Sequence, residues 1–309
     1  MSKPYHISGA KKYALVFAHL GALITVAAWG CSFISTKVLM VDGGLTPVET
    51  YVYRFIAAYL VLLLFTFKRI LAYNWKEEFL FLICGLCAGS LYFITENYAL
   101  KYTSTGNVSL LASISPVFTT ILMAAIYKVR MRPGVLLGSV IAFCGVGCVI
   151  FSSGEGFVIR PTGDLLALSA ALSWAVYTIV VKRLIPIYNS FFITRKLFFY
   201  GVITALPLLF LQDAPLHIDV LFCFREPQYL FNFLFLVLMC SISAYLIWNE
   251  AMKVLGPVTS NNYLYLQPLI TMIVAFVVFD EEIHFLGYVG CCMIIGGLII
   301  SDKLKWDYK

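Results

Sequence analysis

Two short stretches of this sequence, Asn97-Tyr98-Ala99-Leu100-Lys101 and Asn249-Glu250-Ala251-Met252-Lys253, share the pattern Asn-x-Ala-x-Lys and begin 152 positions apart. The same separation relates three further pairs: Pro116 and Pro268, Gly138 and Gly290, and Gly145 and Gly297. Self-similarity at a fixed distance along a chain is typical of a repeated structural unit. The sequence therefore predicts two copies of one fold.

Nearer the start of each copy the separation is 145 positions, which relates Trp29 to Trp174 and Lys37 to Lys182. The second copy must therefore contain seven extra residues, and the polar stretch from Gln212 to Tyr229 is the place where they fit. We expect the two copies to span residues 13–152 and 162–301.

The composition places both copies in a membrane. Of the 309 residues, 61% are hydrophobic and 12% are charged, whereas soluble domains have roughly 45–50% apolar and about 25% charged residues. A membrane-spanning helix needs about 20 largely apolar residues. Ten such stretches are centred near Ala27, Ala58, Ala88, Pro116, Phe143, Trp174, Gly201, Ser241, Pro268 and Ile294. Their residues do not alternate between apolar and polar as barrel strands do. The predicted fold is an all-α polytopic membrane protein with ten transmembrane helices.

Each copy accounts for five of these helices, and an odd number reverses the direction in which the second copy enters the membrane. The predicted architecture is therefore two inverted five-helix repeats. Inverted repeats of this kind build many secondary transporters, which place the substrate near the middle of the membrane between the repeats.

The charges predict an orientation. If the N-terminus lies in the cytoplasm, 17 of the 22 Lys and Arg residues fall on the cytoplasmic side of ten helices and 5 on the other side. The positive-inside rule then places both termini in the cytoplasm. The net charge of +6 is explained by this bias, so no nucleic-acid partner is expected. We expect the first apolar run to be a helix of the mature fold and not a signal peptide.

Cysteine and histidine residues predict no metal site and no cofactor. Cys84-x-x-Cys87 has a spacing found in metal sites, but no histidine or second cysteine pair accompanies it. We interpret these cysteines as small apolar packing residues.

Several motifs, arranged once in each half, identify a family. The first half contains Trp29-Gly30-x-x-Phe33-x-x-x-Lys37, Arg54-Phe55, Ala99-Leu100-Lys101-Tyr102-Thr103-Ser104 and Ser115-Pro116-Val117-Phe118-Thr119. The second half contains Trp174 with Lys182, Pro268-Leu269, and Asp280-Glu281-Glu282 followed by Gly287-x-x-Gly290.

The order of these motifs resembles that of the EamA-type transporters of the drug/metabolite transporter superfamily. The resemblance implies a transporter, often an exporter, of small organic metabolites such as amino acids, in a bacterial-style inner membrane. One departure is Arg130, which stands where the family commonly has an acidic residue matching Glu282.

Polar and aromatic residues recur at helical spacing on six of the predicted helices. On the first helix, for example, Thr25, Trp29, Ser32 and Thr36 are separated by steps of four, three and four residues, which places them on one face. The candidates for contact with substrate are Trp29, Ser32, Glu96, Asn97, Ser113, Trp174, Tyr177, Tyr245, Asn249, Asn261 and Tyr265. These faces predict a central cavity. The alternative is that the polar groups hydrogen-bond between helices and serve stability alone.

Charged residues within the apolar stretches have two interpretations. Glu96 and Glu250 are the acids nearest to membrane depth, where a charge is costly, so either is a candidate to carry a coupling proton or to contact a cationic substrate. The alternative is that Glu96 and Glu250 lie close enough to helix ends to reach interfacial water. The same reasoning predicts that Lys37, Lys182 and Arg54 extend their charged ends toward the interface.

Pro116 and Pro268 fall near the middle of the fourth and ninth helices. Proline removes a backbone hydrogen bond and kinks a helix. The matched pair is a candidate for hinges that open each side in turn, and a static kink is the alternative.

Together these features favour a secondary transporter that works by alternating access through a central cavity, in a plasma (inner) membrane. No nucleotide-binding motif is present, so ATP is not the direct energy source. Proton coupling, exchange and facilitated diffusion stay open, as does the oligomeric state. An intramembrane enzyme would need a nucleophile and base or a metal cluster, which the sequence lacks. A membrane receptor or scaffold without transport is the main alternative.

Overall fold

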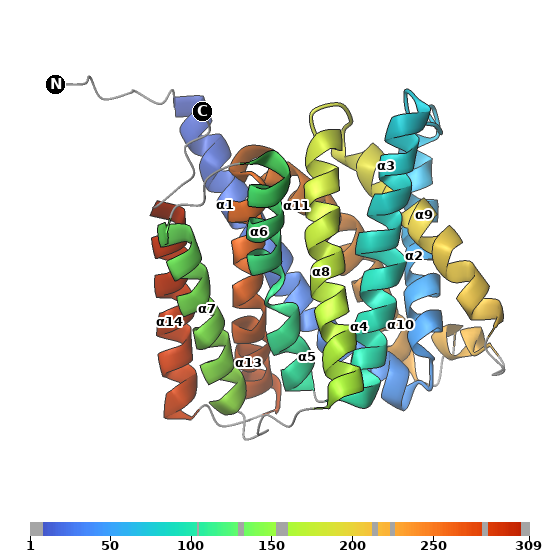
Figure 1. The fold of residues 1–309 in the computed structure, drawn as a ribbon. Helices are drawn as coiled ribbons and strands as arrows, with labels where there is room; N and C mark the ends of the chain where they lie inside the picture. The colour runs from blue at the N-terminus through green and yellow to red at the C-terminus, as the bar shows by residue number, and fades with distance from the viewer. Residues whose placement is uncertain are drawn as a thin grey trace.

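The chain folds into a bundle of helices with two matching halves (Figure 1). The computed structural model of the protein describes residues 9–103, 105–128, 133–152, 160–211, 216–222, 226–279 and 284–303. Every regular element in these ranges is a helix. The first half contains α1 (Gly9–Lys37), the π-helix η1 (Val38–Asp42), α2 (Pro47–Thr66), α3 (Trp75–Gly85), the π-helix η2 (Leu86–Ser90), α4 (Leu91–Tyr102), α5 (Thr105–Ala112), α6 (Ser115–Tyr127) and α7 (Pro133–Ser152).

The second half repeats this order. It contains α8 (Pro161–Leu184), α9 (Ser190–Phe210), the short 3-10 helix η3 (Ile218–Phe222), α10 (Pro227–Phe235), the π-helix η4 (Leu236–Ser243), α11 (Ala244–Leu255), α12 (Pro257–Asn262), the 3-10 turn η5 (Tyr263–Tyr265), α13 (Leu266–Phe279) and α14 (Phe285–Lys303). The predicted motif residues Arg130 and Glu282 lie outside the described ranges.

Helix length and composition fit a polytopic membrane protein. In the described ranges, eight helical segments are long and apolar enough to cross a membrane, and Phe285–Ser301 is a shorter apolar helix. The ninth expected span is divided into α12, η5 and α13. The predicted fold class, an all-α membrane protein of two inverted five-helix repeats, is confirmed.

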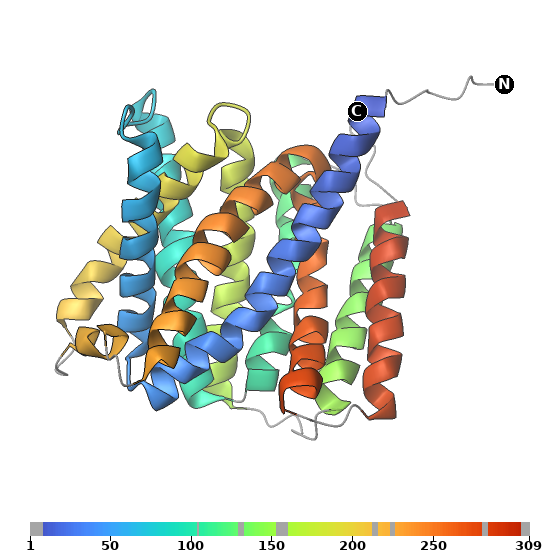
Figure 2. The same cartoon turned by 180° about the vertical axis from the view of Figure 1, so that it is seen from behind.

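The two repeats run in opposite directions. α1 begins and α8 ends on one side of the bundle, which we call the terminal face, and α1 ends and α8 begins on the other side, the loop face (Figures 1 and 2). The packing follows the same two-fold relationship. α2 packs on its counterpart α9 and α7 on its counterpart α14, while α1 packs on α11 and α8 on α4.

Glycines bring α7 and α14 into close contact. Gly138 lies against Gly297, and Gly145 lies against Gly290, so the glycines that repeat at an offset of 152 meet crosswise. A methyl group added to Gly138 would lie 2.5 Å from the carbonyl oxygen of Gly297. Small residues at this spacing allow helices in lipid to approach closely.

Both hinge candidates lie next to breaks in their helices. α5 ends at Ala112 and α6 starts at Ser115, with Pro116 in its first turn. In the second half, the turn η5 separates α12 from α13, where Pro268 is the third residue. Proline is well tolerated in a first turn, because the amide hydrogen that it lacks would have no partner there. The expectation of a kink in the middle of one continuous helix is therefore wrong for the fourth helix, which is two helices.

Candidate transport site

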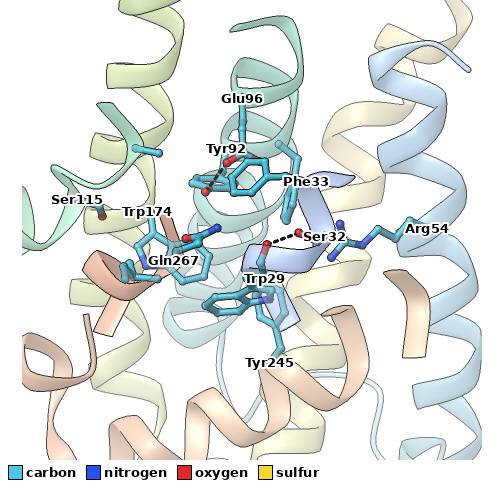
Figure 3. Close-up of a pocket in the computed structure, with 13 residues that line it drawn as sticks. Trp29, Ser32, Phe33, Arg54, Tyr92, Glu96, Ser115, Trp174, Tyr245 and Gln267 are labelled. Atoms are coloured by element: carbon cyan, nitrogen blue, oxygen red, sulfur yellow. Dashed lines mark hydrogen bonds between the residues drawn. The ribbon is translucent and has the colours of Figure 1, made fainter. Parts of the chain in front are cut away.

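A pocket lies at the interface of the two repeats, between α1, α2, α4, α6, α8, α11 and α13 (Figure 3). It encloses an empty volume of about 510 Å³, counting the part open to solvent. Its lining consists of Trp29, Ser32, Phe33, Arg54, Tyr92, Phe93, Glu96, Ala112, Ser115, Trp174, Tyr245, Leu264 and Gln267. Most of this volume is narrow space between side chains, so a solute larger than water requires some side chains to move.

The pocket continues toward the loop face. A second space of about 340 Å³ shares Ser32, Arg54 and Glu96 with the first and adds residues that include Thr36 and Asn97. Thr36 is the residue before the end of α1, so this extension leads away from the terminal face. Trp29 lies about 12 Å from the end of α1, at 1.5 Å per residue.

The aromatic rings of Trp29, Trp174 and Tyr245 form the floor of the pocket, and the ring of Trp248 packs against Trp29 outside the lining. Trp29 packs edge-on against Trp174 with 5.2 Å between ring centroids, and it also contacts Tyr245 at 5.6 Å and Trp248 at 5.1 Å. The indole nitrogen Nε1 of Trp29 donates a hydrogen bond of 2.9 Å to the carbonyl oxygen of Cys240, which belongs to the π-helix η4. The phenol of Tyr245 donates to the carbonyl oxygen of Ala88 at 3.0 Å. These bonds join elements of both repeats and hold the rings in place.

Below this floor, buried hydrogen bonds separate the pocket from the terminal face. Tyr177 Oη donates to Asn249 Oδ1 at 3.3 Å, and Asn249 Nδ2 donates to Thr194 Oγ1 at 3.1 Å. Trp174 Nε1 donates to Asn261 Oδ1 at 3.3 Å. The amide of Asn261 then donates to Thr119 Oγ1 at 2.6 Å and to Thr178 Oγ1 at 3.2 Å. All of these polar side chains are buried. We call this set the closing layer.

Arg54 lies inside the protein, so the expectation that it reaches the interface is wrong. A capping box places the start of α2: Thr46 Oγ1 accepts from the backbone nitrogen of Glu49 at 3.1 Å, and Glu49 Oε2 accepts from that of Thr46 at 2.9 Å. Arg54 then lies about 10 Å along the helix. Only 3% of its surface is exposed, because Phe55 and Phe93 cover the guanidinium.

Glu96 lies on α4 and is 6% exposed. Its Oε1 accepts a hydrogen bond of 2.7 Å from the phenol of Tyr92, one helical turn earlier. The side chain lines the pocket (Figure 3). Glu250, by contrast, is exposed and accepts a hydrogen bond from Ser190 Oγ at 2.6 Å.

The structure brings most of the predicted site residues together. Those that line the pocket or its extension are Trp29, Ser32, Glu96, Asn97, Trp174 and Tyr245. The closing layer contains Tyr177, Asn249 and Asn261. Two predicted residues lie elsewhere. Ser113 donates to the backbone oxygen of Ser109 at 2.7 Å, and Tyr265 is buried in a separate apolar cluster with Val146 and Ile294.

Arg54, Tyr92, Ser115 and Gln267 line the pocket but were not among the site residues predicted from the sequence. Ser115 and Gln267 are related by the offset of 152, and each comes directly before one of the paired prolines. The repeat offset could therefore have identified both residues as site candidates. Arg54 could have been identified because it is a charged residue within an apolar span. In the described part of the chain, no group of three or more His, Cys, Asp or Glu residues is placed to hold a metal ion.

The family model and two relatives that match this chain are all described as transporters. The EamA-like transporter family matches residues 16–151 and again residues 161–301. An uncharacterized transporter of Archaeoglobus fulgidus is 29% identical over 92% of this chain and 96% of its own length. A probable terminal-alkyne amino-acid exporter of Streptantibioticus cattleyicolor is 27% identical over 72% of each chain. One crystal structure, at 18% identity, has a similar fold, with a TM-score of 0.73 over 94% of this chain and 96% of that chain.

Proposed function

Because the chain belongs to the EamA-like transporter family, we propose that it is a secondary transporter that moves small organic metabolites by alternating access. One observation carries this proposal: a pocket of aromatic and polar side chains lies between the inverted repeats, leads toward the loop face and is closed toward the terminal face. Inverted-repeat transporters hold their substrates in such a place. Aromatic walls with a few polar groups suit a small amphipathic solute.

The two repeats, which we propose to span residues 13–152 and 162–301, would move relative to each other around this pocket. The breaks before Pro116 and Pro268 supply matched positions at which the helices can bend. Opening toward the terminal face requires the closing layer to separate, including the bond between Tyr177 and Asn249. Neutral hydrogen bonds are suited to this role, because each contributes only about 0.5–1.5 kcal/mol net.

We propose that both termini lie in the cytoplasm and that the host is a plasma (inner) membrane, which makes the loop face the outer side. The distribution of Lys and Arg supports this orientation. Export is the proposed direction, with amino acids or related solutes as substrates, and the amino-acid exporter among the relatives supports it. The accessibility of tags at each terminus to a membrane-impermeant protease, in intact cells and in inverted vesicles, tests the orientation.

Reconstitution tests the transport itself. Purified protein in liposomes preloaded with amino acids, nucleosides, sugars or organic cations should take up the labelled form of its substrate by counterflow. An imposed pH gradient separates proton coupling, for which Glu96 is the candidate carrier, from exchange and facilitated diffusion. Binding without counterflow would favour a receptor, and uptake equal to that of protein-free liposomes for every solute would contradict the proposal.

A further inference from the structure

The guanidinium of Arg54 is only partly used by the protein. Its Nε donates a hydrogen bond of 2.6 Å to Ser241 Oγ, and its Cζ lies 5.0 Å from the ring centroid of Phe93. Its Nη2 is buried and has no hydrogen-bond partner among the residues that the structure describes. Buried donors in folded proteins are almost always paired, so an orphan of this kind requires an explanation. Arg54 lines both the pocket and its extension, so a small movement of the side chains around Nη2 would bring this donor into contact with a solute there.

Glu96 supplies the opposite charge on another wall of the same space (Figure 3). Tyr92 donates to Oε1 of Glu96, and none of the hydrogen bonds found among the described residues involves its Oε2. No ion pair joins Glu96 to Arg54 in the described part of the chain. The pocket therefore presents one positive and one negative group that the protein does not pair directly with each other.

Buried charges are stable only when they are paired or coordinated. A monocarboxylate would pair with Arg54 and leave Glu96 alone, and an organic cation would do the reverse. A zwitterion pairs with both and adds no net charge to the site. The remaining walls are the rings of Trp29, Trp174 and Tyr245, which offer an apolar surface to the rest of the solute.

We propose that Arg54 and Glu96 form a two-point recognition site for a small amphipathic zwitterion. The carboxylate accepts from Nη2 of Arg54, the ammonium donates to Glu96, and an apolar side chain lies against the aromatic floor. An L-amino acid with an apolar side chain has this chemistry. This inference rests on the proposed function, because it names the class of solute held in the same pocket.

A ligand series on the unmodified protein tests the proposal without any substitution. Thermal-shift titrations of detergent-purified protein use L-leucine, L-methionine and L-phenylalanine, each with its amide, which lacks the carboxylate, and its N-acetyl form, which lacks the ammonium. Binding to the native state raises the unfolding temperature by mass action. We expect at least one amino acid to bind about tenfold more tightly than both of its derivatives, since each derivative loses a charged hydrogen bond. Equal binding of either derivative, or binding by none of the amino acids, overturns the proposal.

Variants assign the two charges to the two ends of the solute. Arg54→Gln should bind the preferred amino acid about tenfold less tightly than the unmodified protein does, whereas its affinity for the amide of that amino acid should stay the same. The preference for a carboxylate is then lost. Arg54→Lys keeps the charge but loses the planar fork, and it should restore part of the preference. Glu96→Gln should remove the preference for the free amine over the N-acetyl form. If Arg54 had only a structural role, the variant would instead lose affinity for the amino acid and for its amide equally, which would contradict the assignment.

The matched control is Lys101→Gln. Lys101 is exposed at the end of α4 on the loop face, and its substitution makes the same change in charge outside the pocket. It should leave every affinity in the series unchanged. If another class of solute shows counterflow while no zwitterion binds, this inference fails and the proposed function stands. If a zwitterion binds with the expected preferences but no solute crosses the liposome membrane, the transport proposal fails instead.

Discussion

Trp29 and Trp174, which are related by the repeat offset of 145 residues, meet edge to face at the interface of the two repeats with 5.2 Å between their ring centroids. Equivalent residues of two inverted copies can meet in this way only close to the axis that relates the copies. Both rings line the pocket. The pocket therefore lies close to the axis that relates the two repeats, and the equivalent tryptophans of both repeats contribute to its lining.

Trp174→Ala should reduce transport at least tenfold, because it removes one ring of the aromatic floor and the hydrogen bond to Asn261. Initial rates of counterflow in liposomes measure the loss. The protein should remain folded, as judged by a single symmetric peak in size-exclusion chromatography. Trp75→Ala is the control, since 83% of Trp75 is exposed. Normal transport by the Trp174 variant would remove this residue from the proposed site.

Tyr177→Phe should weaken the closing layer. The substitution removes the hydroxyl that donates to Asn249 Oδ1, a neutral hydrogen bond that contributes about 1 kcal/mol. The population open toward the terminal face should then rise about fivefold. A cysteine placed at Ser32, in a chain whose native cysteines are replaced, reports this opening through its rate of reaction with an impermeant thiol reagent added at the terminal face.

The control for that experiment is Tyr288→Phe, because Tyr288 is exposed on α14 and its hydroxyl has no part in the closing layer. An unchanged rate of labelling in the Tyr177 variant would show that the bond to Asn249 does not hold the pocket closed.

Gly297→Ala should destabilise the protein by about 1–3 kcal/mol, the usual effect of overpacking a close contact. The added methyl group would lie 2.5 Å from the carbonyl oxygen of Gly138 and 2.6 Å from the backbone nitrogen of Ala142. Gly296→Ala, one position away on the same helix, meets no atom of the described part of the chain within 4 Å. Thermal unfolding in detergent compares the two variants, and equal unfolding temperatures would rule out a tight seam between α7 and α14.

Pro116→Ala and Pro268→Ala should slow transport several-fold while leaving substrate affinity unchanged, if the adjacent breaks act as hinges. Alanine favours a continuous helix across each break, which raises the free energy of bending. Pro161→Ala is the control, because Pro161 also begins a helix but is exposed at the start of α8. Unchanged counterflow rates in both hinge variants would support a static role for these prolines.

The overall fold could be predicted because its causes are visible in the sequence. Long apolar stretches must become helices in lipid, where each backbone group needs a partner within its own segment. The offsets of 145 and 152 residues then grouped these helices into two copies, and five helices in each copy required the inversion. The tryptophans of the pocket were found for the same reason, since helical spacing places Trp29 and Ser32 on one face of the continuous helix α1.

Site residues were predicted less well in segments that were expected to form one continuous helix but contain a break. Ser113 was predicted as a site residue from helical spacing along the fourth helix, but Ser113 lies in the break between α5 and α6. Residues on opposite sides of such a break do not keep the helical phase, so they need not share a face. The turn η5 interrupts the equivalent helix in the second half, and Tyr265 lies within that turn, away from the pocket.

The sequence by itself determined the class of fold, the number and inversion of the repeats and the family, because these depend on hydrophobicity, length and periodicity along a single chain. The tertiary structure decided which charges face the pocket. Arg54 lies near enough to the end of α2 to reach water, yet Phe93 from α4 and Ser241 from the other repeat enclose it. Burial depends on what packs around a side chain, and those neighbours come from parts of the chain that are remote in sequence.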